Sequence, residues 1–277
     1  LWRAIKYILS QPKFDYLWIA ILSLFIFFVW FEGDALYFGG DMMYPLTPSL
    51  NIDRILYTWT DSNGGLVESG MMYYFLFGFF FLADKLGLSV GIAERIYLYI
   101  NFILPGLGMY YLTSVVYSKM QPNGSGKRVA CWMAALFYMF CPTLLKQPQV
   151  YWFYGVFPFI LAFFIKTIDA PNIKGKIKFS LLAALFCFGL LLFTPNGQML
   201  IILALILALY SLLYLLFNRR SIKQLLASWL VFATVVGLVN LGVILPFLIM
   251  VLTQGQEVLA GHEIVAWGRW GDEAPYA

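Results

Sequence analysis

Long apolar runs, separated by short polar or charged segments, make up most of the chain. A transmembrane helix needs about 20 predominantly apolar residues to cross the hydrocarbon core of a bilayer. Seven runs approach or reach that length, at residues 16–31, 96–117, 129–144, 151–165, 179–194, 198–217 and 225–252. We therefore expect an all-α fold, a polytopic transmembrane helix bundle of about seven spans forming one domain over residues 1–277. An eighth run, residues 69–83, is ambiguous because it is short and contains Gly78.

The charged residues between these runs indicate which side of the membrane each connection faces. Cytoplasmic connections carry an excess of Lys and Arg. Four segments are basic, and they contain Arg3, Lys6 and Lys13; Lys119, Lys127 and Arg128; Lys166, Lys174, Lys176 and Lys178; and Arg219, Arg220 and Lys223. All four basic segments can lie on the cytoplasmic side, with the nearly uncharged or acidic connections on the other side, only if residues 69–83 do not cross the membrane. We expect that run to be a helix in the outer interface, with a conventional eighth span as the alternative.

This layout places the amino end inside and the carboxyl end outside. Residues 32–95 become one long first outer loop, and residues 253–277 begin a later outer segment. The sequence starts at Leu1 rather than at a methionine, so we expect it to be a piece of a longer chain.

The composition agrees with a membrane protein and excludes an ordinary soluble domain. Hydrophobic residues make up 62% of the chain and charged residues 12%, and the mean hydropathy is +0.80. The net charge of +4 arises in the basic cytoplasmic segments, so we expect no nucleic-acid partner. Cys131, Cys141 and Cys187 lie inside apolar runs, where we expect small buried side chains rather than metal ligands.

One acidic residue in the first outer loop has neighbours suited to a chemical role. Gly39 and Gly40 precede Asp41 and permit backbone angles that other residues avoid, while Pro45 and Pro48 fix the chain just beyond it. Tyr44 is expected to anchor this turn against the membrane. A carboxylate held in this way can serve as a general base. The spacing Glu32-x-Asp34 leaves a divalent metal open as a cofactor, although no stronger ligand motif is present.

These residues carry a resemblance to a known superfamily. Gly40-Asp41, followed by Tyr44-Pro45-Leu46-x-Pro48 and then by Trp59-Thr-Asp-Ser-Asn-Gly-Gly-Leu66, resembles the first outer loop of GT-C membrane glycosyltransferases. The chain is most similar to the α-(1→3)-arabinofuranosyltransferases of actinobacterial cell walls, loosely from residue 30 to residue 170. The resemblance implies a prokaryotic plasma-membrane enzyme of cell-envelope biogenesis with its active site outside. Asp41 matches the catalytic aspartate of that family.

The resemblance also implies the substrates. The donor is a polyprenyl-phosphate sugar, and the acceptor is a glycan or protein outside the cytoplasm. The outer cations Arg54, Lys146 and Arg269 are candidates to pair with the donor phosphate, and residues 71–81 are candidates to line its prenyl chain. The other substrate-binding candidates of the outer segments are Asp34, Tyr44, Glu68 and His262, the only histidine of the chain.

Two alternatives remain open at this stage. A polytopic transporter or lipid flippase of the cell envelope usually carries ionisable residues inside its spans. Here the spans are almost free of charge, and Asn101 and Asn240 are expected to be the main buried polar side chains, with Pro105 and Pro246 as sites of helix kinks. A non-catalytic scaffold of an envelope assembly is the other alternative.

Overall fold

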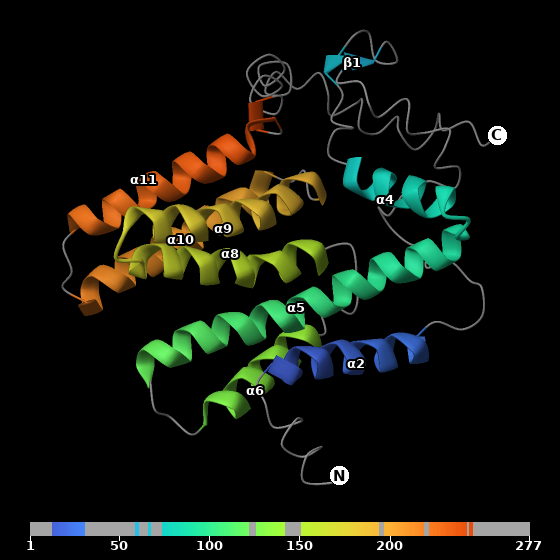
Figure 1. The fold of residues 1–277 in the computed structure, drawn as a ribbon, viewed down its shortest axis with the longest axis horizontal. Coiled ribbons are helices and arrows are strands. Elements are labelled where there is room, and N and C mark those ends of the chain that lie inside the picture. The colour runs from blue at the N-terminus through green and yellow to red at the C-terminus, as the bar shows by residue number, and fades with distance from the viewer. Residues whose placement is uncertain are drawn as a thin grey trace, which may run out of the picture.

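The computed structural model describes residues 13–30, 59–60, 66–67, 74–121, 126–141, 151–193, 197–218, 222–242 and 244–245. Within these ranges the chain is helical except for one pair of two-residue strands (Figure 1). The helices are α2 (Lys13–Trp30), α4 (Tyr74–Lys85), α5 (Val90–Met120), α6 (Lys127–Met139), α8 (Tyr151–Asp169), α9 (Ile173–Phe193), α10 (Gly197–Asn218) and α11 (Ile222–Val239). The expected all-α class is confirmed for the described residues.

The strands β1 (Trp59–Thr60) and β2 (Leu66–Val67) form a short antiparallel ladder. Trp59 pairs with Val67, and Thr60 pairs with Leu66. The Asp-Ser-Asn-Gly-Gly sequence between the strands contains the residue types that favour tight hairpin connections. This ladder lies within the segment that the sequence assigns to the first outer loop.

Helix α5 is the centre of the first half of the fold. It has 31 residues, a length of about 46 Å, and it contacts α2, α4, α6 and α8. Two glycines allow its neighbours to approach closely. A Cβ added at Gly106 would lie 2.9 Å from Ile19 Cγ2 of α2, and one added at Gly108 would lie 2.8 Å from the Gly155 carbonyl oxygen of α8.

A tight turn joins α4 to α5. Gly87 has a φ of +76°, a left-handed conformation that favours glycine, and the Leu88 N–H donates to the Ala83 carbonyl at 3.0 Å. Ser89 then caps α5, because its hydroxyl oxygen accepts a hydrogen bond from the Ile92 N–H at 3.3 Å. Phe80 and Ala83 of α4 pack against α5 in one hydrophobic cluster.

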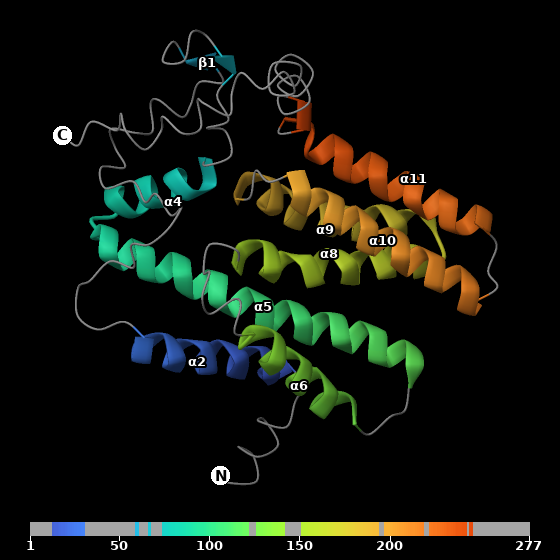
Figure 2. The ribbon, with the colours of Figure 1, turned by 180° about the vertical axis from the view of Figure 1, so that it is seen from behind.

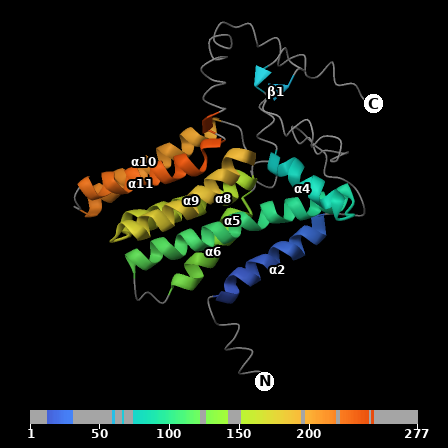
Figure 3. The same ribbon diagram turned by 45° about the horizontal axis from the view of Figure 1, so that its top comes forward.

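The second half of the fold packs around α8. Its Phe164 is fully buried, and its ring lies 4.9 Å from the rings of both Trp229 and Phe232 of α11. The largest hydrophobic cluster combines α8, α9, α10 and α11. Seen from behind and from above, these four helices stay together on one side of α5, while α2 and α6 lie on the other (Figures 2 and 3).

The helices agree with most of the predicted runs, with differences that have local causes. Helix α6 has 13 residues and ends at Met139 instead of continuing to residue 144, because Pro142 disfavours helix just before it. Helix α11 ends at Val239 and Asn240 occupies a turn, but residues 241–242 and 244–245 are helical again, and residues 246–252 of the predicted run lie outside the described residues. Residues 90–95, assigned to the outer loop, instead form the start of α5 because Ser89 caps the helix there.

Two described helices, α5 and α11, are long and apolar enough to cross a membrane. Helices α2, α8, α9 and α10 have 18 to 22 residues each, but each includes residues whose side chains the structure does not describe. The seven-span bundle therefore remains a prediction. Helix α4, with 12 residues, is about 18 Å long and falls short of the about 30 Å that a span needs.

Candidate functional site

The predicted catalytic and substrate-binding side chains lie outside the described residues. These are Asp34, Asp41, Tyr44, Arg54, Glu68, Lys146, His262 and Arg269. The described helices nevertheless show at which end of the bundle the helices next to these candidate residues lie. The contacts at the two ends of the bundle are therefore described in turn.

Apart from Lys85 of α4, the described lysines near the helix ends gather at one end of the bundle, which we call the inner end. Lys119 of α5 forms an ion pair with Asp169 of α8, with 2.7 Å between Nζ and Oδ2. Lys127 of α6 donates to Ser118 of α5 at 2.6 Å. Lys176 of α9 donates to the Ser228 hydroxyl of α11. These contacts link α5, α6, α8, α9 and α11 at the same end.

The opposite end, which we call the outer end, is where α2 finishes and α5 begins. Asp15 of α2 contacts Tyr110 of α5, whereas the Ala20 carbonyl accepts a hydrogen bond from the Tyr99 hydroxyl at 2.9 Å. The two helices therefore run antiparallel, and the carboxyl end of α2 lies beside the amino-terminal half of α5. Helix α4 immediately precedes α5 and packs against its first turns, so α4 and the carboxyl end of α2 both lie at the outer end (Figure 1).

Helix α5 buries polar side chains in its outer half. Glu94 is 0% exposed and Asn101 is 1% exposed. They share one helix face with Leu98 and Pro105, since the four positions follow a spacing of three or four residues. The sequence interpretation overlooked Glu94, although its place in this buried periodicity was the available signal.

Asn240, in the turn after α11, is a further buried polar side chain. It is 0% exposed, and its Nδ2 donates to the Val236 carbonyl at 2.8 Å and to the Ala184 carbonyl of α9 at 3.3 Å. Asn101 and Asn240 are buried as predicted, but they are not the main buried polar side chains, because the charged residues Asp15 and Glu94 are equally buried. The side-chain carbonyl oxygens of Asn101 and Asn240 accept no hydrogen bond in the described part of the chain.

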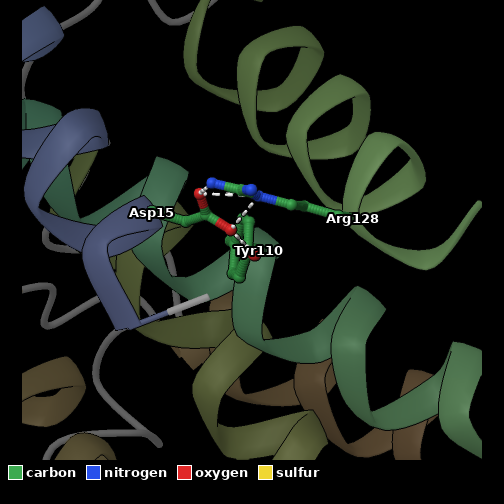
Figure 4. Close-up of polar contacts among 3 residues, drawn as sticks. All are labelled: Asp15, Tyr110 and Arg128. Atoms are coloured by element: carbon green, nitrogen blue, oxygen red, sulfur yellow. Dashed lines mark hydrogen bonds and ion pairs between the residues drawn. The ribbon is translucent and has the colours of Figure 1, made fainter. Parts of the chain in front are cut away.

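The inner end contains a buried ion pair that the sequence interpretation missed (Figure 4). The Arg128 Nε donates to Asp15 Oδ1 and Oδ2 at 3.0 and 2.9 Å, and Nη2 donates to Oδ1 at 2.5 Å. The Tyr110 hydroxyl donates to Oδ2, so one carboxylate joins α2, α5 and α6. Asp15 is 0% exposed, whereas the Arg128 side chain is 41% exposed.

Electrostatics favours the ionised form of this pair. Both residues precede the apolar runs of their helices. Burial is the largest influence on the pKa of Asp15 and raises it, but hydrogen bonds from Arg128, Tyr110 and Trp132 together outweigh burial and hold the pKa below its ordinary value. The hydrogen bond to Asp15 raises the pKa of Arg128. Such a paired carboxylate is poorly suited to accept a proton from a substrate.

The two ends therefore differ in the chemistry they offer. At the inner end, both described carboxylates, Asp15 and Asp169, are engaged with cations. No described group of three or more His, Cys, Asp or Glu side chains is arranged to hold a metal ion. The carboxyl end of α2 and helix α4, which flank the segment containing Asp41, both lie at the outer end.

Comparison with known proteins does not assign the chain to a family. The chain matches no protein-family model, no curated protein and no solved structure. The functional argument consequently rests on the residues and on the arrangement of the helices.

Proposed function

We propose that the protein is an integral membrane glycosyltransferase that transfers a sugar from a polyprenyl-phosphate donor to an extracytoplasmic glycan or protein acceptor. The observation that carries the proposal is the common location of the helix ends flanking residues 31–73. The carboxyl end of α2 and helix α4 both lie at the outer end, away from the lysines of α5, α6, α8, α9 and α11 (Figure 1). The positive-inside rule makes that end extracytoplasmic, so the Asp41 segment leaves and returns on the outer side.

The surface of the bundle supports a location in the bilayer. Helices α5 and α11 meet the length and hydropathy that a span requires. Large apolar side chains are exposed along most of the other helices, including Phe25, Phe137 and Leu205. Exposed apolar side chains on this scale suit a lipid environment rather than water.

Helix α4 supports a donor site at the outer surface. Its 12 residues are too few to cross a bilayer, and it packs against the first turns of α5 through Phe80 and Ala83. A short apolar helix in this position agrees with the interfacial helix expected for residues 69–83. In this proposal the aromatic side chains of α4 contact the polyprenyl chain where it enters the bilayer from its phosphate.

The proposed reaction needs one carboxylate and a phosphate site. The Asp41 carboxylate removes the proton from an acceptor hydroxyl while its oxygen attacks the anomeric carbon of the donor. The bond from that carbon to the phosphate oxygen breaks, and polyprenyl phosphate leaves. Arg54, Lys146 and Arg269 are the cations proposed to stabilise the phosphate, because they belong to outer segments.

One observation favours a transporter as the second candidate. The amide of Asn101 is buried within α5, that of Asn240 is buried in the turn after α11, and α5 and α8 contain Pro105 and Pro158. Buried polar side chains are typical of substrate paths through membranes. However, the described spans hold few ionisable side chains, and the acidic residues cluster in the outer loop.

A direct experiment separates the two functions. The protein in nanodiscs receives a polyprenyl-phosphate arabinofuranose labelled in the sugar, together with an arabinan oligosaccharide acceptor. Label recovered in the oligosaccharide supports the glycosyltransferase. Label that instead crosses the membrane of sealed vesicles, still attached to its lipid, supports the transporter.

A further inference from the structure

The inner end of the bundle carries a large excess of positive charge. Two described acidic residues lie there, Asp15 and Asp169, and each is paired with a cation. The basic residues at that end whose side chains the structure describes are Lys119, Lys127, Arg128, Lys166, Lys174, Lys176, Lys178 and Lys223. The excess of six positive charges is larger than the net charge of +4 of the whole chain.

Much of this charge has no internal compensation. Lys127 and Lys166 donate to neutral hydroxyl groups, those of Ser118 and Tyr111, both at 2.6 Å. Basic residues also occupy the first turns of α6, α9 and α11, which contain no acidic residue. Because the amino end of a helix is its positive pole, lysines there raise the local potential further. The inner end therefore attracts anions.

One exposed face of helix α9 combines basic and apolar side chains. Lys174, Lys178, Leu181 and Leu185 are all exposed, and their spacing of four, three and four residues places them on one helix face. We call these four residues the α9 stripe. Neither lysine of the stripe makes an ion pair with another described residue. The opposite face, with Ser180 and Ala183, is buried in the bundle.

The α9 stripe changes from cationic to apolar along the helix axis. The lysines lie at the inner end, and Leu185 lies about 10 Å further along, in the direction of the bilayer centre. An anionic headgroup with attached acyl chains has the matching order of charge and apolar surface. A soluble anion would match the lysines alone, and an acidic protein would not match the exposed leucines.

We propose that the α9 stripe binds an anionic phospholipid of the inner leaflet. The headgroup phosphate contacts Lys174 and Lys178, and an acyl chain lies along Leu181 and Leu185. This site is at the opposite end of the bundle from α4 and the carboxyl end of α2, the helices that flank the segment containing Asp41, so it goes beyond the proposed reaction. It shares with the proposed function only the assumption that the bundle lies in a membrane.

Native mass spectrometry of the purified protein in detergent tests this proposal. The protein is titrated with phosphatidylglycerol or with phosphatidylcholine of identical acyl chains, and the ratio of the two Kd values is measured. We expect the wild-type protein to prefer phosphatidylglycerol. Each lysine near a charged surface contributes about fivefold, so Lys174→Gln/Lys178→Gln should lower the preference by roughly 25-fold.

A matched control and a soluble competitor complete the test. Lys85→Gln removes an exposed lysine at the outer end and should leave the preference unchanged. Glycerol 3-phosphate should not displace the lipid, because it lacks acyl chains. Equal Kd values for the two lipids, a loss below about twofold in the double variant, or displacement by glycerol 3-phosphate would overturn the proposal. Asp41→Asn leaves this measurement unaffected, so failure here and failure of sugar transfer are distinguishable.

Discussion

Removing Arg128 should destabilise the protein more than removing the charge of its partner Asp15. The Asp15 carboxylate is 0% exposed, so Arg128→Gln leaves a buried anion that only Tyr110 and Trp132 still stabilise. Breaking a buried pair from one side typically costs about 3–5 kcal/mol. Asp15→Asn instead leaves a guanidinium that is 41% exposed and can turn towards water. That variant should lose about 1.5–3 kcal/mol, the usual contribution of a hydrogen bond to a charged group.

The double variant Asp15→Leu/Arg128→Met separates the charge from the packing. It removes both charges and keeps apolar volume between α2 and α6. Replacing a buried ion pair by hydrophobic residues is often nearly neutral. We therefore expect the double variant to be more stable than Arg128→Gln alone, which would show that the uncompensated charge causes the loss.

Thermal unfolding in detergent provides the measurement, with the chain's own thiols as reporters. Cys131 of α6 and Cys187 of α9 are buried free thiols in different parts of the bundle. A thiol reagent with mass-spectrometric readout reports when each becomes accessible. Arg128→Gln should lower Tm by on the order of 10 °C and expose Cys131 before Cys187.

Lys127→Gln is the matched control, because it removes the neighbouring charge of α6 outside the ion pair. It should change stability by less than about 1 kcal/mol. If Asp15→Asn were as damaging as Arg128→Gln, or if neither variant lowered Tm, the reasoning about the buried carboxylate would be wrong.

Three further predictions concern pH, topology and the donor. The pKa of Asp15 is lowered in the folded protein, so the stabilisation from its charged form is complete above the ordinary carboxyl pKa of about 3.9. That stabilisation is lost as pH falls through the lowered pKa. The Tm advantage of the wild-type protein over Asp15→Asn should therefore be constant from pH 7 to 5 and shrink below about pH 4. An advantage that shrinks already at pH 6 would contradict this. Cysteines at Asp61 and Ser89 should both react with an impermeant thiol reagent in intact cells, whereas protection of Ser89→Cys until lysis would show that the intervening run crosses. Lys146→Glu/Arg269→Glu should weaken binding of a labelled polyprenyl-phosphate sugar, and unchanged affinity would remove these cations from the donor site.

Hydrophobic patterning predicted the positions of the helices because each apolar face spans many residues. The same averaging explains why helix ends were predicted less well. Because Ser89 caps α5, the helix starts at Val90 instead of residue 96, and Pro142 explains why α6 ends at Met139. Ser89 and Pro142 are single residues that are visible in the sequence, but the prediction followed the longer apolar runs instead.

The ion pair between Asp15 and Arg128 could not be read from the sequence. The two residues are 113 positions apart, and their contact depends on how α2 packs beside α6. Asp15 was nonetheless a signal, as an acidic residue directly before the first apolar run and among basic neighbours. Glu94 offered a similar signal, since it falls on the buried face of α5 that also contains Asn101.

The most direct test of the central claim is the rate of sugar transfer by Asp41→Asn. The variant keeps the size of the side chain but cannot accept the proton of the acceptor hydroxyl. Removing a general base lowers the rate by about 100- to 10,000-fold. Asp53→Asn, which changes an acidic residue of the same loop with no assigned role, is the matched control, and the thermal stability of each variant in nanodiscs is measured alongside. The account predicts a loss of this size for Asp41→Asn with unchanged stability and a near-normal control. Near-wild-type transfer by a folded Asp41→Asn protein would contradict it.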